Sequence, residues 1–310
     1  TTAVASRANR ERVRDMCFIM KRHRAQRGIA PVQWAAGRTT GTLADNPAMP
    51  STHPAHQRLL AIETSTDALS VALGTGEPGA PLWQRSGPGG AQASGTLLPM
   101  VRSLLLEAGW SLDTLAAVVF GRGPGSFTGL RTACSVAQGL AYGVQGLGRA
   151  GGLPVLPVDT LLALAEEARQ ARMDAGQPLP GAIVALLDAR MGEVYVAPYA
   201  CHAGGPAGLT PLAPARLCTP ADLPAYLQER TPGERLLAGN VFEMDALAAL
   251  AGQRHPALPT AAALLRLAPG LLAAGHAVAA QDALPLYVRD KVAQTTAERE
   301  SIRLAAEAGA

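Results

Sequence analysis

The chain contains only four cysteines, and their positions provide no metal-ligand spacing. Cys17, Cys134, Cys201 and Cys218 form neither a C-x-x-C pair nor a related pattern. Few, scattered cysteines are typical of a reducing compartment, where thiols are not paired into disulfides. We therefore expect a cytoplasmic protein whose cysteines bind no metal.

Long apolar runs are also absent. The longest, near Leu264 to Ala280, is interrupted by an arginine, a proline, a glycine and a histidine. A helix that crosses a bilayer needs about 20 consecutive, mostly apolar residues. The sequence therefore predicts no membrane span.

Excess positive charge is confined to the first 57 residues. They contain nine basic and three acidic residues, a net charge of +6, whereas residues 58–310 contain 18 basic and 21 acidic residues, a net charge of −3. The slightly acidic body argues against binding nucleic acid over a broad basic face. We interpret residues 1–57 as a basic, disordered N-terminal extension, with Met49 as a plausible start. A transit peptide or an RNA-binding arm stays open.

The hydrophobic pattern after residue 57 predicts an α/β fold with an internal repeat. The first half reads as strand, strand, strand, helix, strand, helix, strand, followed by a further helix. These elements are expected near 58–63, 69–73, 82–85, 94–109, 115–120, 127–144, 153–158 and 160–175.

The second half repeats this order more loosely. Strands are expected over 182–188, 194–199, 211–217 and 235–239, and helices over 220–230 and from Phe242 and Ala261 onward. Repetition of one α/β unit implies two similar lobes that face a cleft. Ligands of such architectures usually lie between the lobes.

A glycine-rich turn joins a predicted strand to a predicted helix in VVFGRGPGSFTGLRTA, residues 118–133. Its residues of interest are Gly121, Gly123, Gly125, Ser126, Thr128 and Gly129. Ser126 or Thr128 can cap the helix, and the bare amides at a helix N-terminus suit an anion. Two phosphate-binding patterns fail, because Lys291 is the only lysine after residue 57 and Thr128 replaces the last glycine of G-x-G-x-x-G. Tight packing of strand on helix, with no ligand, is an equally good interpretation.

Four segments carry a resemblance to a known family. LLAIETSTDALSVAL, GRGPGSFTGLRTA, DARMGEVYVAPY and LPLYVRDKVAQT together resemble the TsaB family, also called YeaZ, over about residues 58–296. The resemblance implies two RNase H-like lobes of the actin, hexokinase and Hsp70-like ATPase superfamily. We place the first lobe at 58–157 and the second, with a C-terminal tail, at 158–310.

The resemblance also implies a function. Members of the family act as non-catalytic subunits that bind the catalytic protein TsaD. With the ATPase TsaE, they support transfer of threonylcarbamoyl to the adenosine beside the anticodon of tRNAs that read codons beginning with A. The expected partners are thus a TsaD-like subunit, a TsaE-like ATPase and, through the complex, tRNA; a homodimer is possible.

The phosphate-binding turns of the superfamily look degenerate in this chain. The first turn is matched by Glu63, Thr64, Ser65 and Thr66, with glutamate at a position where aspartate is common in the family. A second departure is Ala93, at a position where the family often has histidine. The second turn keeps Asp188, but Arg190 and Met191 replace small residues. We expect no cofactor and no metal, since His202, His255 and His276 are widely spaced. The alternative is a self-sufficient ATP-dependent phosphotransferase that uses Glu63 and Asp188 around a metal-bound nucleotide.

Two apolar helical stripes are candidates for the partner surface. Core packing is the default explanation of both, but the resemblance implies pairing through helices of the first lobe. The candidate residues are Leu97, Leu98, Val101, Leu105, Leu130, Ala133, Ala137, Leu140 and Ala141. Arg122 and Arg131 flank the glycine turn, and either can hold an anion or a partner's carboxylate; solvated surface charges are an equally good interpretation.

Overall fold

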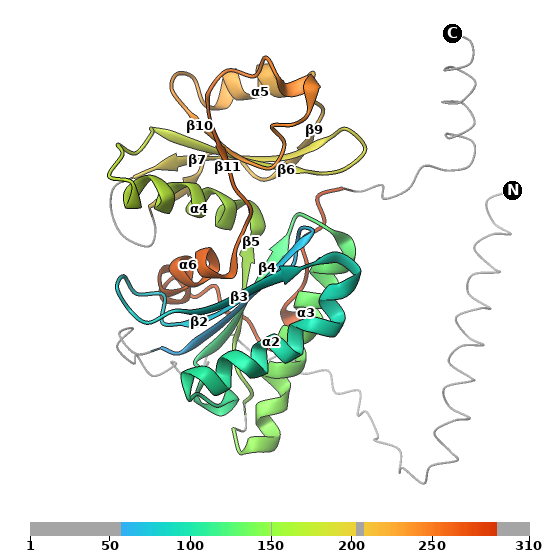
Figure 1. Cartoon of the computed structure of the whole chain (residues 1–310), viewed down its shortest axis with the longest axis vertical. Helices are drawn as coiled ribbons and strands as arrows, with labels where there is room; N and C mark the ends of the chain where they lie inside the picture. The colour runs from blue at the N-terminus through green and yellow to red at the C-terminus, as the bar shows by residue number, and fades with distance from the viewer. Residues whose placement is uncertain (1–56, 150, 203–207, 290–310) are drawn as a thin grey trace, which may run out of the picture. The chain divides into compact units, whose positions relative to one another are not determined.

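A computed structural model describes residues 57–149, 151–202 and 208–289, which fold into two α/β lobes, each built on one β-sheet (Figure 1). The predicted N-terminal extension, except Gln57, and the predicted C-terminal tail from residue 290 lie outside the described residues. Among the described helices, none is both long and apolar enough to cross a membrane.

The first lobe has a five-stranded sheet in the order β3-β2-β1-β4-β5. β1 pairs antiparallel with β2 and parallel with β4, and β2–β3 and β4–β5 continue the two directions. The strands are β1 (Leu59–Glu63), β2 (Ala68–Gly74), β3 (Trp83–Pro88), β4 (Ala117–Gly123) and β5 (Val155–Asp159). The predicted RNase H-like fold is confirmed, and so is the predicted sequential order of strands and helices in this lobe.

The central strand β1 is buried on both faces of the sheet, and its successive residues point to opposite sides. Leu60 and Ile62 pack against helices α2 (Ala93–Ala108) and α3 (Phe127–Gly143). Leu59 and Ala61 pack in a second core with helix α6 (Ala261–Ala273). The all-apolar start of β1 is therefore the signature of a central strand covered on both sides.

The second lobe repeats the arrangement in the order β11-β10-β6-β7-β8, with β9 also on β7. Helix α4 covers one face and α5 the other. The elements are α4 (Thr160–Asp174), β6 (Ala182–Asp188), β7 (Val194–Cys201), β8 (Leu209–Pro211), β9 (Arg216–Cys218), α5 (Leu223–Arg230), β10 (Leu236–Gly239) and β11 (Gln253–Pro256). The single strand predicted near 211–217 is in fact the pair β8 and β9, and β11 was not predicted.

The helix predicted from Phe242 is wrong. Only a 3₁₀ turn, Asp245–Leu247, forms in this region. Every third residue of segment 241–250 is apolar and packs in the core with β10 and α5: Val241, Met244, Leu247 and Leu250. A spacing of three matches the 3₁₀ period of 3.0 residues per turn rather than the 3.6 of an α-helix.

Helices α4 and α6 contact each other between the two sheets. The Glu166 carboxylate of α4 is bonded by Arg169, at 2.7 Å, and by Arg266 of α6, at 3.2 Å, and both Glu166 and Arg169 are buried. Although α6 follows the second sheet in sequence, it packs on the first. The predicted lobe boundary between residues 157 and 158 stays a proposal. Helix α6, which that boundary assigns to the second lobe, packs on the sheet of the first lobe.

The glycine turn brings α3 into direct contact with the turn between β1 and β2. A Cβ atom at Gly129 would lie 1.9 Å from the carbonyl oxygen of Thr64, and one at Gly125 would lie 2.5 Å from that of Ser65. The backbone of Ser126 uses the same proximity to donate to the carbonyl of Ser65 at 2.7 Å. These glycines are therefore required for packing, which is the predicted role of the turn that needs no ligand.

We predict that Gly129→Ala destabilises the protein by about 3 kcal/mol, because the new methyl group overlaps backbone that cannot move without opening the first lobe. Denaturant unfolding followed by circular dichroism measures the change. Gly139→Ala on the same helix is the matched control. Nothing lies within 4 Å of a Cβ at Gly139, so this change should stabilise by up to about 1 kcal/mol through helix propensity. Equal effects of the two substitutions would contradict the packing argument.

Candidate functional site: an inter-lobe cleft and a helical surface

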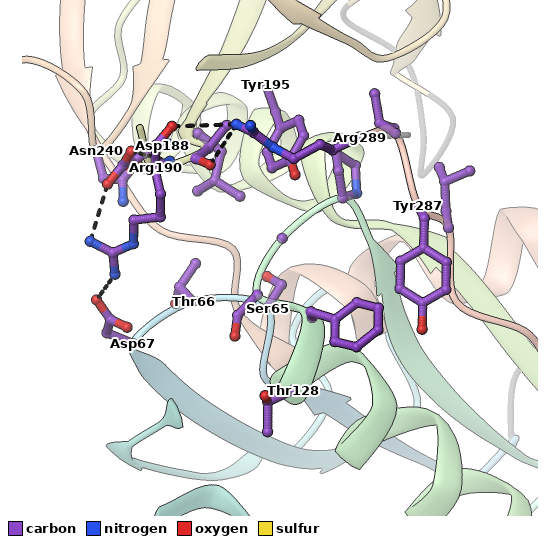
Figure 2. A pocket seen from close by; sticks show the side chains of 18 of the residues that line it. Ser65, Thr66, Asp67, Thr128, Asp188, Arg190, Tyr195, Asn240, Tyr287 and Arg289 are labelled. Atoms are coloured by element: carbon purple, nitrogen blue, oxygen red, sulfur yellow. Dashed lines mark hydrogen bonds and ion pairs between the residues drawn. The ribbon is translucent and has the colours of Figure 1, made fainter. Parts of the chain in front are cut away.

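A cleft of about 620 Å³ lies where the β1–β2 turn, the glycine turn and the β6–β7 turn converge (Figure 2). A fourth wall is residues 286–289. The position agrees with the expectation that a site lies between the lobes. Of the predicted residues, the cleft collects Ser65, Thr66, Gly125, Ser126, Thr128 and Asp188.

Glu63 and Thr64 face away from the cleft and hold the first turn together. Glu63 is 1% exposed, and its Oε1 accepts the backbone N–H of Ser65 at 2.7 Å. Its Oε2 has no hydrogen-bond partner among the described residues. Thr64 donates its hydroxyl to the Gly129 carbonyl at 2.7 Å. Thr64 therefore stabilises the contact between the turn and α3, and Glu63 stabilises the turn itself.

Burial raises the pKa of the Glu63 carboxyl above its ordinary value of 4.5, although the bonds from Ser65 oppose the shift. A carboxyl without solvent is more stable in the neutral form, because charge is costly to desolvate. A sealed carboxyl whose pKa is raised is a poor ligand for a metal ion. The observed environment is thus unlike that of an acid that holds a metal-bound phosphate.

The second turn directs an arginine across the cleft. Arg190 lies 2.5 Å from Asp67 of the first lobe and 3.3 Å from Asp188 of its own turn (Figure 2). Asp188 also accepts the Arg190 N–H at 2.7 Å, and its own N–H donates to Asn240 at 2.9 Å. Arg190 and Met191 reach this arrangement with positive φ angles of 63° and 58°. The Asp188 carboxylate is therefore engaged by its own chain.

A C-terminal strap, residues 278–289, ties α3 to the second-lobe turn. It begins with a backbone bridge between Val278 and Val155, and its Ala283 carbonyl accepts from Cys134 and Gln138 of α3. It ends with Arg289, which bonds Glu193 at 2.7 Å and the carbonyl of Ala189 at 3.1 Å. The strap was not predicted as a structural element, because an extended segment has no periodic pattern of its own.

The glycine turn orders the start of α3 with a single capping residue. The Ser126 hydroxyl accepts the N–H of Gly129, whereas Thr128 is exposed at the cleft. Ser126 is thus the cap among the two predicted candidates.

Two other glycines of the turn are also constrained. A Cβ atom at Gly121 would lie 1.9 Å from the Glu63 carboxylate, and Gly123 has a φ of 116°.

The predicted partner surface needs correction. Six of its nine residues are 5% exposed or less and form the core of the first lobe: Leu97, Val101, Leu130, Ala133, Ala137 and Ala141. The stripe they form faces the sheet, so they cannot contact a partner in the folded protein. Leu98 is 50% exposed, and Leu105 and Leu140 are half-buried. Leu106, 73% exposed, was missed because Leu105 fits the helical stripe better.

We predict that Glu63→Gln stabilises the protein increasingly as the pH rises above 4.5, relative to the natural chain. Below that pH both folded and unfolded states are protonated at Glu63. Above it the unfolded state releases the proton before the folded state does, so stability is lost until the raised folded pKa is passed. Thermal unfolding from pH 4 to 8 measures the difference in Tm between the two proteins. Glu243→Gln, at an exposed glutamate, is the control and should show no such trend. A Tm difference for Glu63→Gln that stays constant with pH would show that folding does not raise the pKa of Glu63.

Comparison with known proteins identifies the family. Residues 91–217 match the family model for TsaD, tRNA N6-adenosine threonylcarbamoyltransferase. The tRNA threonylcarbamoyladenosine biosynthesis protein TsaB of Escherichia coli K12 is 33% identical over 255 residues, which are 76% of this chain and 96% of the relative. The Haemophilus influenzae protein of the same name is 40% identical over 140 residues, 44% of this chain and 51% of the relative.

A solved structure gives the same result. YeaZ from Pseudomonas aeruginosa has 33% sequence identity and a TM-score of 0.60, and the match covers 75% of this chain and 100% of that one. The match includes both sequence and fold, and the E. coli relative is matched over nearly its whole length. The chain therefore belongs to the TsaB family, also called YeaZ.

Proposed function

We propose that the chain is the scaffold subunit of the complex that attaches threonylcarbamoyl to the adenosine beside the anticodon of tRNAs reading codons that begin with A. In this proposal it binds and activates a TsaD-like catalytic subunit, a TsaE-like ATPase serves the same complex, and tRNA is reached through the complex. Membership in a family whose relatives are named for threonylcarbamoyladenosine biosynthesis supports the role in this pathway.

The observation that carries the proposal is an exposed apolar surface on α2 and α3, which pack side by side on the first sheet (Figure 1). On α2 it consists of Leu98 and Leu106, with the half-buried Leu105 next to Leu106, and on α3 the small residues Ser135 and Gly139 are exposed. Large apolar side chains beside small ones let a second helix pair approach closely, with an apolar contact centre.

The similarity to a TsaD model indicates which partner fits. The matched residues, 91–217, include all of α2 and α3. Chains that share a fold can associate through equivalent surfaces, as two copies do in a two-fold dimer. A TsaD-like subunit with equivalent helices is thus a natural partner. The same surface allows a homodimer when that partner is missing.

A non-catalytic role is supported by the environments of Glu63 and Asp188, the two acids of the alternative phosphotransferase. The Glu63 carboxyl is sealed beneath the first turn, where burial raises its pKa. Asp188 is bonded by the N–H and the guanidinium of Arg190, whose side chain extends to Asp67. Both acids that a phosphotransferase would use are occupied in maintaining the turns. We therefore assign the chemistry to the partner.

We predict that Leu98→Arg weakens binding to the TsaD-like subunit of the same organism by about 30-fold or more. A charge replaces an apolar contact at the centre of the surface, where a hot-spot loss of about 2 kcal/mol is ordinary. Calorimetric titration measures the dissociation constant, and formation of threonylcarbamoyladenosine in tRNA should fall in parallel.

Leu212→Arg is the matched control, because Leu212 is an exposed leucine of the second lobe, 42% exposed against 50% for Leu98. It should leave binding within about twofold, the range of a non-interface change. If the natural chain fails to bind the TsaD-like subunit, or if Leu98→Arg and Leu212→Arg behave alike, the proposed function or its surface is wrong.

A further inference from the structure

Arg131 is the fifth residue of α3, and its side chain contacts two aromatic residues. Its guanidinium lies 3.7 Å from the ring centre of Phe127, and its Nε donates to the Tyr287 hydroxyl at 3.1 Å. The rings of Phe127 and Tyr287 are 5.1 Å apart. Two aromatic side chains, one from α3 and one from the strap, thus contact the guanidinium, and its two terminal nitrogens have no hydrogen-bond partner among residues 57–149, 151–202 and 208–289. An arginine ordered in advance loses less entropy when it binds.

The charge of Arg131 is not neutralised by an acid within the described parts of the chain. The other arginines near the cleft are all paired: Arg122 with Asp159 at 2.5 Å, Arg190 with Asp67, and Arg289 with Glu193. Arg131 is exposed and appears in none of these ion pairs. The two arginines that flank the glycine turn therefore have different environments. Arg122 has an internal role, and Arg131 is available to a binding partner.

The surroundings of Arg131 favour a carboxylate supplied by a protein. Phe127 and Tyr287 are 38% and 44% exposed, and Leu284 of the strap is 64% exposed. Exposed aromatic rings around an arginine are the composition of a protein–protein hot spot. The N-terminus of α3 adds a partial positive charge next to Arg131.

A polyanion is disfavoured at the same place. Asp67, Asp188 and Glu193 lie around the adjoining cleft turns, and residues 58–310 carry a net negative charge of −3. These carboxylates are paired with Arg190 and Arg289, so among the described residues Arg131 is the one cation of this surface without an acid. A phosphate backbone needs several cations, whereas a single carboxylate needs only Arg131.

We propose that the surface formed by Phe127, Arg131, Leu284 and Tyr287 is a docking site for an acidic side chain of the partner subunit. The terminal nitrogens of Arg131 bind the carboxylate as a two-pronged pair, while the rings and Leu284 exclude water around it. The inference rests on the proposed function, because Arg131 shares helix α3 with the exposed residues Ser135 and Gly139. It adds a charge-dependent contact that selects the partner and sets its register.

The test compares Arg131→Gln, Arg131→Lys and Arg216→Gln in calorimetric titrations against the TsaD-like subunit at several salt concentrations. Arg216 is the matched control: it too is an exposed arginine stacked on an aromatic ring, 4.9 Å from the ring centre of Tyr226, but in the second lobe. We expect Arg131→Gln to weaken binding about 30-fold and to reduce its salt dependence. Arg131→Lys should be nearly as weak, because lysine lacks the planar fork. Arg216→Gln should stay within about twofold.

A charge-reversal experiment separates direct pairing from a structural effect on the strap. Arg131→Glu should abolish binding, and one acid-to-lysine replacement in a scan of the partner's exposed carboxylates should restore it. Unchanged thermal unfolding of each Arg131 variant verifies that α3 and the strap remain folded.

The outcomes distinguish the inference from the function on which it rests. If Leu98→Arg weakens binding while Arg131→Gln does not, the docking site is overturned and the scaffold proposal survives. Failure of the natural chain to bind the TsaD-like subunit overturns both. If Arg131→Gln instead lowers the affinity of the isolated chain for tRNA and leaves protein binding intact, the site contacts RNA, and a protein carboxylate is the wrong occupant.

Discussion

The rest of the structure depends on the close approach of two backbone turns. The carbonyls of Thr64 and Ser65 lie where the side chains of residues 129 and 125 would otherwise be, so only glycine fits at those positions. This contact fixes where α3 begins and provides the acceptor for the Ser126 N–H. It also places Glu63 beneath the turn, out of reach of water. The glycine turn, whose sequence suits an anion site, thus packs against the backbone of the β1–β2 turn.

The cleft beside this contact is held together by its own charged groups. Arg190 connects the two lobes through Asp67, and Arg289 of the strap fixes the second-lobe turn through Glu193. The Arg190–Asp67 pair is well exposed, so it contributes at most about 1 kcal/mol and orients the turn more than it stabilises the fold. Glu63 and Asp188, the two acids of the alternative phosphotransferase, accept hydrogen bonds from neighbouring residues of their own turns. The exposed apolar residues of α2 that we propose as the partner surface lie outside this cleft.

Much of the fold is predictable because its local signals agree with its tertiary environment. The buried run of β1, the alternating pattern of β2 and the capped start of α3 each have one favourable solution. The segment from Phe242 misleads because its residues favour a helix while their spacing of three suits a 3₁₀ turn. In the site, several of the predicted turn residues line the cleft, but the roles of Glu63 and Thr64 depend on Gly121 and Gly129. Those contacts span more than 50 positions of sequence, and no local pattern reports them.

The sequence alone determined the two α/β lobes, the glycine turn and the family, because these follow from periodicity and from motifs of adjacent residues. Periodicity also groups the residues of a helix into faces, but it does not say which face is covered. Only the tertiary structure decided that Leu97 and Ala137 are core while Leu98 and Leu106 are exposed. It likewise decided that Arg122 is paired with Asp159, whereas Arg131 contacts Phe127 and Tyr287. The physical reason is that the covering elements, a sheet on one side and the strap on the other, come from distant parts of the chain.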